Sequence, residues 1–376
     1  MTVGILKETV EDNRVALLPE GVKSLFTLNV ETVLVEASAG INANADDEAY
    51  KQAGGRIASS EEILKESDIL LKVNEYKEAE VAAAKAGSVM IGVFQPLFNP
   101  EMVNIFRQHH KTSFSLDIIP RTTRAQSMDI LSSMATVAGY KAVLLAAENL
   151  PKFFPMFMTA AGSIAPAKVL ILGAGVAGLQ AIATARRLGA VVEAFDVRSA
   201  VKEEVQSLGA KFVEVQGAQE DKAAGGYAVE QTEDYKRLQQ EAIDEHAIKS
   251  DVVISTAQIP GRKAPLLISK DTVEKMKPGS VIIDLAASSG GNCELSKPGQ
   301  TVVHHQVKII GPANLASNLP SDASKMFGKN VINFLKLIIK DGQLNLNFDD
   351  DIVKGTCVTH EGEIISERVR DIQKSS

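Results

Sequence analysis

Short apolar runs alternate with segments of helical spacing through the first 120 residues. Such runs are typical of strands buried on both faces of a sheet. Their alternation with helices predicts βαβ units and a parallel sheet. The expected strands are residues 3–6, 32–36, 68–73, 88–94 and 113–119, and the expected helices are 20–28, 60–66, 78–85 and 100–109.

The same alternation returns after residue 168 and predicts a second parallel sheet. A long helix from residue 126 or 127 to 150 would join the two, and a helix over 324–340 is expected to return to the first domain. The fold class is therefore α/β, with two Rossmann-like parallel-sheet domains joined by long helices. The predicted domains are 1–125 plus 320–376, and 126–319. The expected strands of the second sheet are 169–172, 191–195, 211–215, 251–256, 280–285 and 307–311, with helices at 176–188, 202–208 and 233–248.

The second sheet opens on a glycine-rich turn. Gly173, Gly175 and Gly178 form G-x-G-x-x-G between a predicted strand and a predicted helix. The first glycine permits the tight turn, the second lets a pyrophosphate approach the backbone, and the third lets the helix pack close to the strand. The helix start offers N–H groups and the positive end of its dipole to phosphates. The simpler interpretation is an ordinary strand–helix turn.

Asp196 follows Gly178 by 18 residues, at the end of the next predicted strand. A carboxylate there accepts hydrogen bonds from the adenosine ribose and repels a 2′-phosphate, which favours NAD(H) over NADP(H). Arg198 weakens that inference, because an arginine can pair with a phosphate. Further contacts with the nucleotide are expected from Val176, Ala177, Val197 and Ala257.

Three further segments are candidates for function. Residues 121–133 are polar and charged at their start, and Arg121, Gln126 and Asp129 alone would suggest a solvated loop with a local ion pair. Residues 216–232 contain glycines and are long for a βα connection, which predicts a mobile loop. Residues 286–292 follow a predicted strand at its C-terminal end, where ligands bind in open α/β sheets.

Composition excludes several classes of function. The chain has 376 residues, of which 45% are hydrophobic, enough for two cores. A net charge of −7 argues against a nucleic-acid partner. Cys293 and Cys357 are far apart, so we expect neither a disulfide framework nor a cysteine-based metal site. We also expect no histidine metal site, because neighbouring histidines such as His304 and His305 point in different directions on a regular element.

Targeting signals are not apparent either. The first residues enter a predicted strand directly, without the pattern of a signal peptide. We find no run of roughly 18 apolar residues that would span a membrane. The expectation is a cytoplasmic protein, which leaves docking to a membrane partner open.

Five stretches carry a family resemblance. Over nearly its whole length the chain resembles the NAD(H)-binding subunit of proton-translocating nicotinamide nucleotide transhydrogenase, a family related to alanine dehydrogenase. The most specific stretch is R-A-Q-S-M-D-I-L-S-S within 121–133. The stretches are 121–133, 158–162, 173–185, 276–286 and 355–359.

The resemblance implies roles for individual residues. The loop residues match those that position the nicotinamide and its ribose, with Gln126 holding the nicotinamide and Arg121 and Asp129 holding the loop. The glycine pair before Tyr227 matches a mobile loop that closes over nucleotide, whereas closing contacts from Gln231 or Tyr235 stay open. The cofactor-binding residues implied in this way are Arg121, Gln126, Asp129, Ser132, Tyr140, Asp196, Gly226 and Tyr227.

The resemblance also implies an activity and its partners. Hydride would pass from NADH to NADP⁺ held on a partner subunit, and this step needs no general base. Proton translocation would require a membrane-spanning subunit, so the chain would lie at the inner membrane only through its partners. The family further implies a homodimer.

Two alternatives compete with this function. Alanine dehydrogenase needs an acid–base residue and cations for the substrate carboxylate. Arg14 and Lys72 match its cation positions, but Gln95 and Ser288 stand where its histidine and aspartate are expected. Retained packing and ion pairing is the interpretation we favour for Arg14 and Lys72. The second alternative is a non-catalytic module that senses NAD(H).

Overall fold

The computed structural model describes residues 1–215, 232–259 and 263–375, and the chain divides into two compact units. Unit 1 comprises residues 1–134 and 316–376, and unit 2 comprises residues 135–315. The sequence pattern predicts the divisions at 125/126 and 319/320. The first division falls later because the 3-10 helix Thr123–Met128 packs against α11 (Pro320–Ile338) within unit 1.

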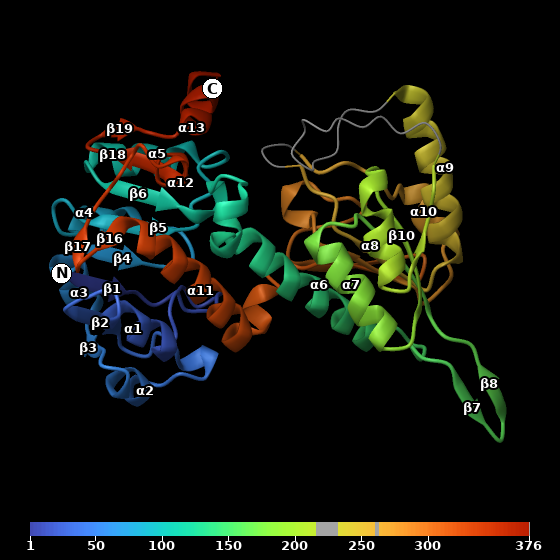
Figure 1. Cartoon of the computed structure of the whole chain (residues 1–376). Coiled ribbons are helices and arrows are strands. Elements are labelled where there is room, and N and C mark those ends of the chain that lie inside the picture. Colours follow the sequence, from blue (N-terminus) through green and yellow to red (C-terminus); the bar gives the residue numbers. More distant parts are fainter. Residues whose placement is uncertain (216–231, 260–262, 376) are drawn as a thin grey trace. The chain divides into compact units, whose positions relative to one another are not determined.

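Unit 1 is built on an eight-stranded sheet of order β19-β18-β6-β5-β4-β1-β2-β3 among the described residues. The strands from β1 to β6 are parallel, and β18 and β19 add an antiparallel edge beside β6 (Figure 1). The strands are β1 (Thr2–Ile5), β2 (Thr32–Glu36), β3 (Arg56–Ala58), β4 (Ile69–Leu71), β5 (Val89–Gly92), β6 (Thr112–Ser115), β18 (Cys357–His360) and β19 (Glu363–Ile364), with a separate hairpin of β16 (Ile339–Lys340) and β17 (Gln343–Leu344).

Helices cover both faces of this sheet, and α11 supplies much of one core. Its Phe327, Val331 and Phe334 are buried with strand residues of β1, β2 and β4, and the rings of Phe334 and Phe114 are 5.3 Å apart. Pro320 begins α11, which its fixed φ favours at a first helical position. The other helices are α1 (Pro19–Phe26), α2 (Asp47–Gln52), α3 (Ser60–Glu66), α4 (Glu78–Ala83), α5 (Pro100–Gln108), α12 (Asp351–Thr356) and α13 (Glu367–Ser375).

Unit 2 contains a seven-stranded sheet of order β11-β10-β9-β12-β13-β15-β14 in the described part of the chain. All neighbours pair in parallel except β14 with β15. The strand order reverses between β9 and β12, the point where such sheets bind ligands. The elements are β9 (Lys168–Leu172), α7 (Val176–Arg187), β10 (Val191–Phe195), α8 (Lys202–Ser207), β11 (Lys211–Phe212), α9 (Glu233–Lys249), β12 (Val252–Ser255), α10 (Lys270–Lys275), β13 (Val281–Asp284), β14 (Gln300–His304) and β15 (Val307–Gly311).

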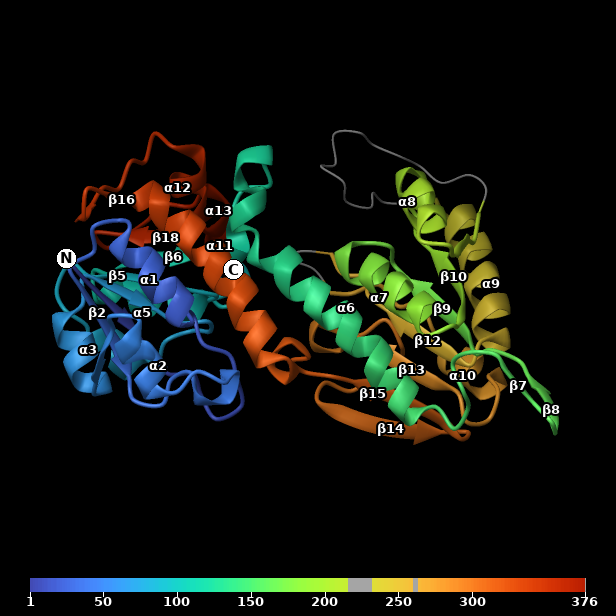
Figure 2. The ribbon, with the colours of Figure 1, turned by 60° about the horizontal axis from the view of Figure 1, so that its bottom comes forward.

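The central strand β9 is buried on both faces, which confirms the interpretation of its apolar run. Val169 and Ile171 pack into the core formed with α6 (Ile130–Asn149), α7 and α8, whereas Leu170 and Leu172 pack into the core formed with α9 and α10. Figure 2 shows α6 lying alongside α7. The sheet is therefore covered on both sides, as a parallel sheet requires.

Several elements differ from those that the sequence predicts. The long helix α6 begins at Ile130 and not at residue 126 or 127, because residues 123–128 form a 3-10 helix first. The strands β3 and β14, the helix α2 and the whole tail after α11 were not anticipated. A hairpin of β7 (Phe157–Thr159) and β8 (Gly162–Ile164) follows α6, and it extends away from the sheet of unit 2 (Figure 1).

The expectation that no segment is long and apolar enough to span a membrane was wrong. Within the described ranges, one helix, α6, meets both requirements, with 20 residues and a mean hydropathy of 1.5. Serine, threonine and glycine interrupt its apolar residues without lowering the mean much. Ala142, Val143 and Ala146 of this helix pack into the core of unit 2, and a core helix passes the same test of length and composition.

Candidate functional site

The glycine-rich turn leaves β9 with Gly173 in a left-handed conformation (φ +98°). A Cβ on Gly178 would lie 1.9 Å from the carbonyl oxygen of Gly173, so only glycine allows α7 to start this close to the strand. A Cβ on Gly175 would meet nothing within 4 Å among the described residues. The backbone at Gly175 is therefore open on the side where a pyrophosphate would approach.

The start of α7 is suited to bind an anion. Gly175 is the N-cap, and no side chain of the described residues caps the helix, so N–H groups such as that of Val176 remain available for a ligand. The helix α6 passes close by, since a Cβ on Gly139 would lie 2.2 Å from the carbonyl oxygen of Ala177. Tyr140, the next residue on α6, is 39% exposed.

Asp196 follows β10 and is already engaged by neighbouring donors. Its Oδ2 accepts the backbone N–H of Ala174 at 2.7 Å, which ties it to the glycine turn. Arg198 donates to both carboxylate oxygens at 2.8 Å, and this hydrogen bonding raises the pKa of Arg198. The side chain of Asp196 is 7% exposed, and Val197 beside it is half-buried. Arg198 therefore neutralises the carboxylate that was expected to select against a 2′-phosphate.

A polar network that the sequence pattern does not reveal holds the turn from β12. The hydroxyl of Thr256 donates to the carbonyl oxygen of Gly173 at 3.1 Å. The side chain of Asn292 is fully buried; it accepts the N–H of Ala257 at 3.1 Å and donates to the carbonyl oxygen of the same residue at 2.9 Å. Ala257 is thereby fixed beside the turn by two hydrogen bonds.

Asp284 supports this network from below. Its buried carboxylate accepts the Ser255 hydroxyl and the backbone N–H groups of Ala286, Asn292 and Cys293, at 2.9 to 3.2 Å. The loop after β13 is thus held by one carboxylate that has four donors. A signal was present in the sequence, because this aspartate ends a buried strand at the ligand-binding edge.

The predicted mobile loop, with Gly226 and Tyr227, lies outside the described residues, as does Gln231. Tyr235 is described and lies on the first turn of α9, where it is buried. Burial, together with the charge of Asp196, raises the pKa of the Tyr235 phenol. Its surroundings are those of a packed side chain.

The segment 121–129 belongs to unit 1 and is pinned there at two points. Arg124 forms a bidentate ion pair with Asp350 at 2.6 and 2.8 Å and also contacts Asp351, and this ion pair lowers the pKa of Asp350. Asn330 of α11 donates to the carbonyl oxygen of Ser127 at 2.9 Å. The backbone of this segment is therefore held from the C-terminal region of unit 1.

Gln126 and Arg121 are exposed on the pinned segment. Within the described chain, the Gln126 side-chain amide has no hydrogen-bond partner, so its donor and acceptor are available to a ligand. Asp129 has a structural role, because its carboxylate accepts the backbone N–H of Ser132 at 3.0 Å and the Ser132 hydroxyl at 2.6 Å. It caps the start of α6 in the manner of an N-cap residue.

The two cations shared with alanine dehydrogenase are buried and paired, which confirms the expectation of packing and ion pairing. Arg14 binds Asp12 at 2.5 to 3.2 Å, and Lys72 lies 3.1 Å from Glu80. Their side chains are 8% and 2% exposed. Gln95 is exposed with a left-handed backbone (φ +49°).

The expectation for the neighbouring histidines was wrong at one pair. The rings of His304 and His305 are stacked with centroids 4.7 Å apart, because the two residues lie at a hairpin turn and not on a regular element. Together with Glu274 they form a group of three potential metal ligands among the described residues. The prediction of no histidine metal site therefore lacks its stated reason.

Both cysteines are buried free thiols. Burial raises the pKa of Cys293 to about 12 and also raises that of Cys357. We therefore expect native protein to react with a disulfide reagent at pH 8 on the order of 10³-fold more slowly than urea-unfolded protein, which should release two equivalents. Fast reaction of either thiol in folded protein would contradict this placement.

The sheet order, the glycine turn and the acid after β10 define a Rossmann-type dinucleotide-binding protein. Residues 4–138 match the family "Alanine dehydrogenase/PNT, N-terminal domain", and residues 142–367 match "Alanine dehydrogenase/PNT, C-terminal domain". The chain is 47% identical to the first segment of a divided NAD(P) transhydrogenase subunit alpha of Rhodospirillum rubrum, over 97% of this chain and 98% of that protein. It belongs to the alanine dehydrogenase/PNT family and, within it, to the NAD(P) transhydrogenase alpha subunits.

A solved structure and a second relative agree with this placement. The transhydrogenase of Sinorhizobium meliloti superposes with a TM-score of 0.89 at 42% identity, covering 97% of this chain and 100% of that one. Alanine dehydrogenase of Mycolicibacterium smegmatis is more distant, at 28% identity over 98% of this chain and 96% of its own. The order of similarity favours the transhydrogenase branch of the family.

Proposed function

We propose that this chain binds NADH and transfers hydride directly to NADP⁺ held by a partner subunit. The Rhodospirillum rubrum relative is named as one segment of an alpha subunit, which supports the need for further subunits. One of them would bind NADP(H), and a membrane-spanning one would couple the reaction to proton translocation. The chain would then be cytoplasmic and lie at the inner membrane only through these partners.

The observation that carries this proposal is the burial and pairing of Arg14 and Lys72. A dehydrogenase of amino acids needs free cations for the substrate carboxylate and an acid–base pair for the amine. Here both cations are consumed by Asp12 and Glu80. Hydride transfer between two nicotinamide rings moves no other proton, so it requires neither group.

The chain's contribution to catalysis would then be orientation. The two C4 atoms must approach to about 3–3.5 Å with water excluded. In this proposal Val176, Ala177 and the glycines of the turn receive the pyrophosphate, Asp196 receives the ribose, and Val197, Arg198 and Ala257 border the adenosine end. Ser132, Tyr140, Gly226 and Tyr227 would add contacts to the rest of the nucleotide.

Gln126 would hold the nicotinamide carboxamide, and its pinned backbone would fix the amide in place. Replacement of Gln126 by alanine is expected to lower the rate of hydride transfer roughly 10- to 30-fold with no change in melting temperature, because the side chain is exposed. Stopped-flow absorbance with the partner subunit measures the rate. The matched control is Thr123→Ala on the same 3-10 helix, and an equal loss of rate in this control would contradict the assignment.

The proposal as a whole is tested by binding and turnover of the purified chain. We expect tight fluorescence titration with NADH, weak titration with NADPH, and NADH oxidation only after an NADP(H)-binding transhydrogenase subunit and NADP⁺ are added. Reduction of NAD⁺ by the isolated chain with L-alanine would overturn it.

One observation favours the alternative of an amino-acid dehydrogenase. Burial raises the pKa of Glu8, and this carboxyl lies near Lys72. Its oxygens, however, accept the backbone N–H of Val73 at 2.6 Å and the Asn74 amide at 2.8 Å. A screen of small 2-amino and 2-oxo acids separates this alternative from the proposal.

We further propose that the β7–β8 hairpin binds a second copy of the chain. All residues of both strands are exposed, and Met158 is 79% exposed at its outer end. Exposed apolar surface of this kind marks interaction sites. Phe153, Met156, Phe157 and Ile164 extend the same apolar surface, with 40% to 60% exposure.

Replacement of Met158 by aspartate is therefore expected to convert the dimer to a monomer, since the charge would be desolvated on association. Light scattering after size exclusion measures the mass. Phe98→Ser, at a residue of unit 1 that is 58% exposed, is the control that should stay dimeric. A wild-type chain that is monomeric at micromolar concentration would contradict the proposed dimer.

A further inference from the structure

The turn between β14 and β15 places two histidine rings together. His304 ends β14 and pairs with Val307, so His305 and Gln306 form a two-residue hairpin turn. Both turn residues have left-handed backbones, with φ +46° and +62°, which is the requirement of a type I′ turn. The result is a stacked pair of imidazoles at an interplanar angle of 29°.

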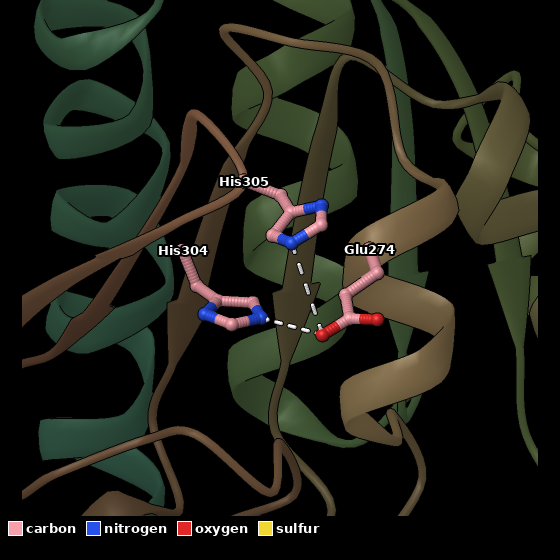
Figure 3. A group of neighbouring side chains, drawn as sticks. All are labelled: Glu274, His304 and His305. Carbon is pink, nitrogen blue, oxygen red and sulfur yellow. Dashed lines mark hydrogen bonds and ion pairs between the residues drawn. The ribbon is translucent and has the colours of Figure 1, made fainter.

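Glu274, from α10, completes the group (Figure 3). Its Oε1 lies 2.8 Å from Nε2 of His304 and 4.0 Å from Nε2 of His305. The ligand atoms of all three residues lie within 4.8 Å of one another. Side-chain exposures of 28%, 57% and 32% for His304, His305 and Glu274 leave the group accessible from solvent.

The donor set fits a zinc-type ion. Two imidazole nitrogens and one carboxylate oxygen are common ligands of Zn²⁺, and a water can fill the fourth position. With bonds of about 2.0–2.2 Å, ligand atoms in a tetrahedral site are about 3.3 Å apart. The separations of 2.8 and 4.0 Å lie on either side of that value, so small side-chain rotations would suffice.

Lys270 is the competing cation. Its Nζ lies 3.8 Å from the same oxygen of Glu274. The lysine side chain is 50% exposed and long, so it can move into solvent when an ion binds. Two histidines together with a carboxylate would then favour the metal ion over the single ammonium group.

We propose that His304, His305 and Glu274 bind a divalent transition-metal ion of the zinc class. The bound ion joins α10 to the β14–β15 hairpin and thereby holds the antiparallel edge of the unit 2 sheet. This edge strand has β15 as its strand partner in the described sheet, so a cross-link to a helix stabilises it. The proposal is independent of the transhydrogenase reaction.

The experiment uses the full chain after treatment with a chelator. Titration with Zn²⁺ against a chromophoric chelator should give one site per chain of micromolar affinity, and Co²⁺ should give visible absorption bands typical of nitrogen and oxygen ligation. Saturating Zn²⁺ should also raise the melting temperature by a few degrees. Absence of binding below millimolar Zn²⁺ would overturn the proposal.

Variants locate the ion. His304→Ala, His305→Ala and Glu274→Gln should each weaken Zn²⁺ binding at least tenfold and remove the rise in melting temperature, whereas His109→Ala should change neither. Circular dichroism establishes that each variant is folded, and at least one of the three substitutions is at an exposed side chain, His305. Unchanged affinity in folded His305→Ala and Glu274→Gln would place any bound ion elsewhere and refute the site.

Discussion

Replacement of Gly178 by alanine should destabilise the chain by about 3 kcal/mol, because the new methyl group would lie 1.9 Å from a backbone oxygen. Real Cβ atoms do not approach this closely, so α7 must shift from β9 and disturb both cores of unit 2. For a chain region of this size, the loss corresponds to a fall in melting temperature of roughly 6–12 °C. Thermal denaturation followed by circular dichroism measures it.

Gly175→Ala is the matched control within the same motif. Its Cβ would meet nothing within 4 Å of the described structure, so the melting temperature should change little. The methyl group would instead occupy the space through which a pyrophosphate approaches, and NADH affinity should fall at least tenfold. If both variants lost stability equally, the assignment of separate roles to the two glycines would be wrong.

Replacement of Asp196 by alanine should reduce the preference for NADH over NADPH by roughly 10²- to 10³-fold. The variant loses the acceptor for the ribose hydroxyls and leaves the Ala174 N–H without its bond, which should lower NADH affinity about 10- to 100-fold. It also frees the guanidinium of Arg198, which can then pair with a 2′-phosphate and raise NADPH affinity. Fluorescence titration with both nucleotides measures the two changes.

A second substitution separates these effects. In Asp196→Ala/Arg198→Ala the gain for NADPH should disappear, while the loss for NADH should remain. Glu193→Ala is the control on the same strand, since that acid is engaged by His246 and Lys211. A selectivity unchanged by Asp196→Ala would contradict the role of the carboxylate.

The strands with continuous apolar runs could be located from sequence because both of their faces are buried. β2 and α3 have the bounds that their patterns predict, and β9 fills two cores with alternate residues. β14 could not be located in this way, because most of its residues are exposed at the edge of the sheet and it has no apolar run. The error about His304 and His305 followed directly from the missed hairpin.

The candidate site shows the same division. The glycine spacing and the acid after β10 are local patterns that carry their own mechanical reason. The support from Thr256, Asn292 and Asp284 depends on hydrogen bonds between loops far apart in the chain, and single polar residues have no periodicity that would reveal such pairing. Arg198 was noted in the sequence, but its bidentate grip on Asp196 became visible only in three dimensions.

The central claim is that this chain delivers hydride from NADH directly to a second nucleotide and performs no acid–base step. It is tested most directly by a single turnover of NADH doubly deuterated at C4 of the nicotinamide, with NADP⁺ and the NADP(H)-binding subunit, followed by mass spectrometry of the product. The account predicts NADPH that carries one deuterium at C4 and no hydrogen from solvent. Solvent hydrogen at that position, or NADH oxidised without any NADPH formed, would contradict it.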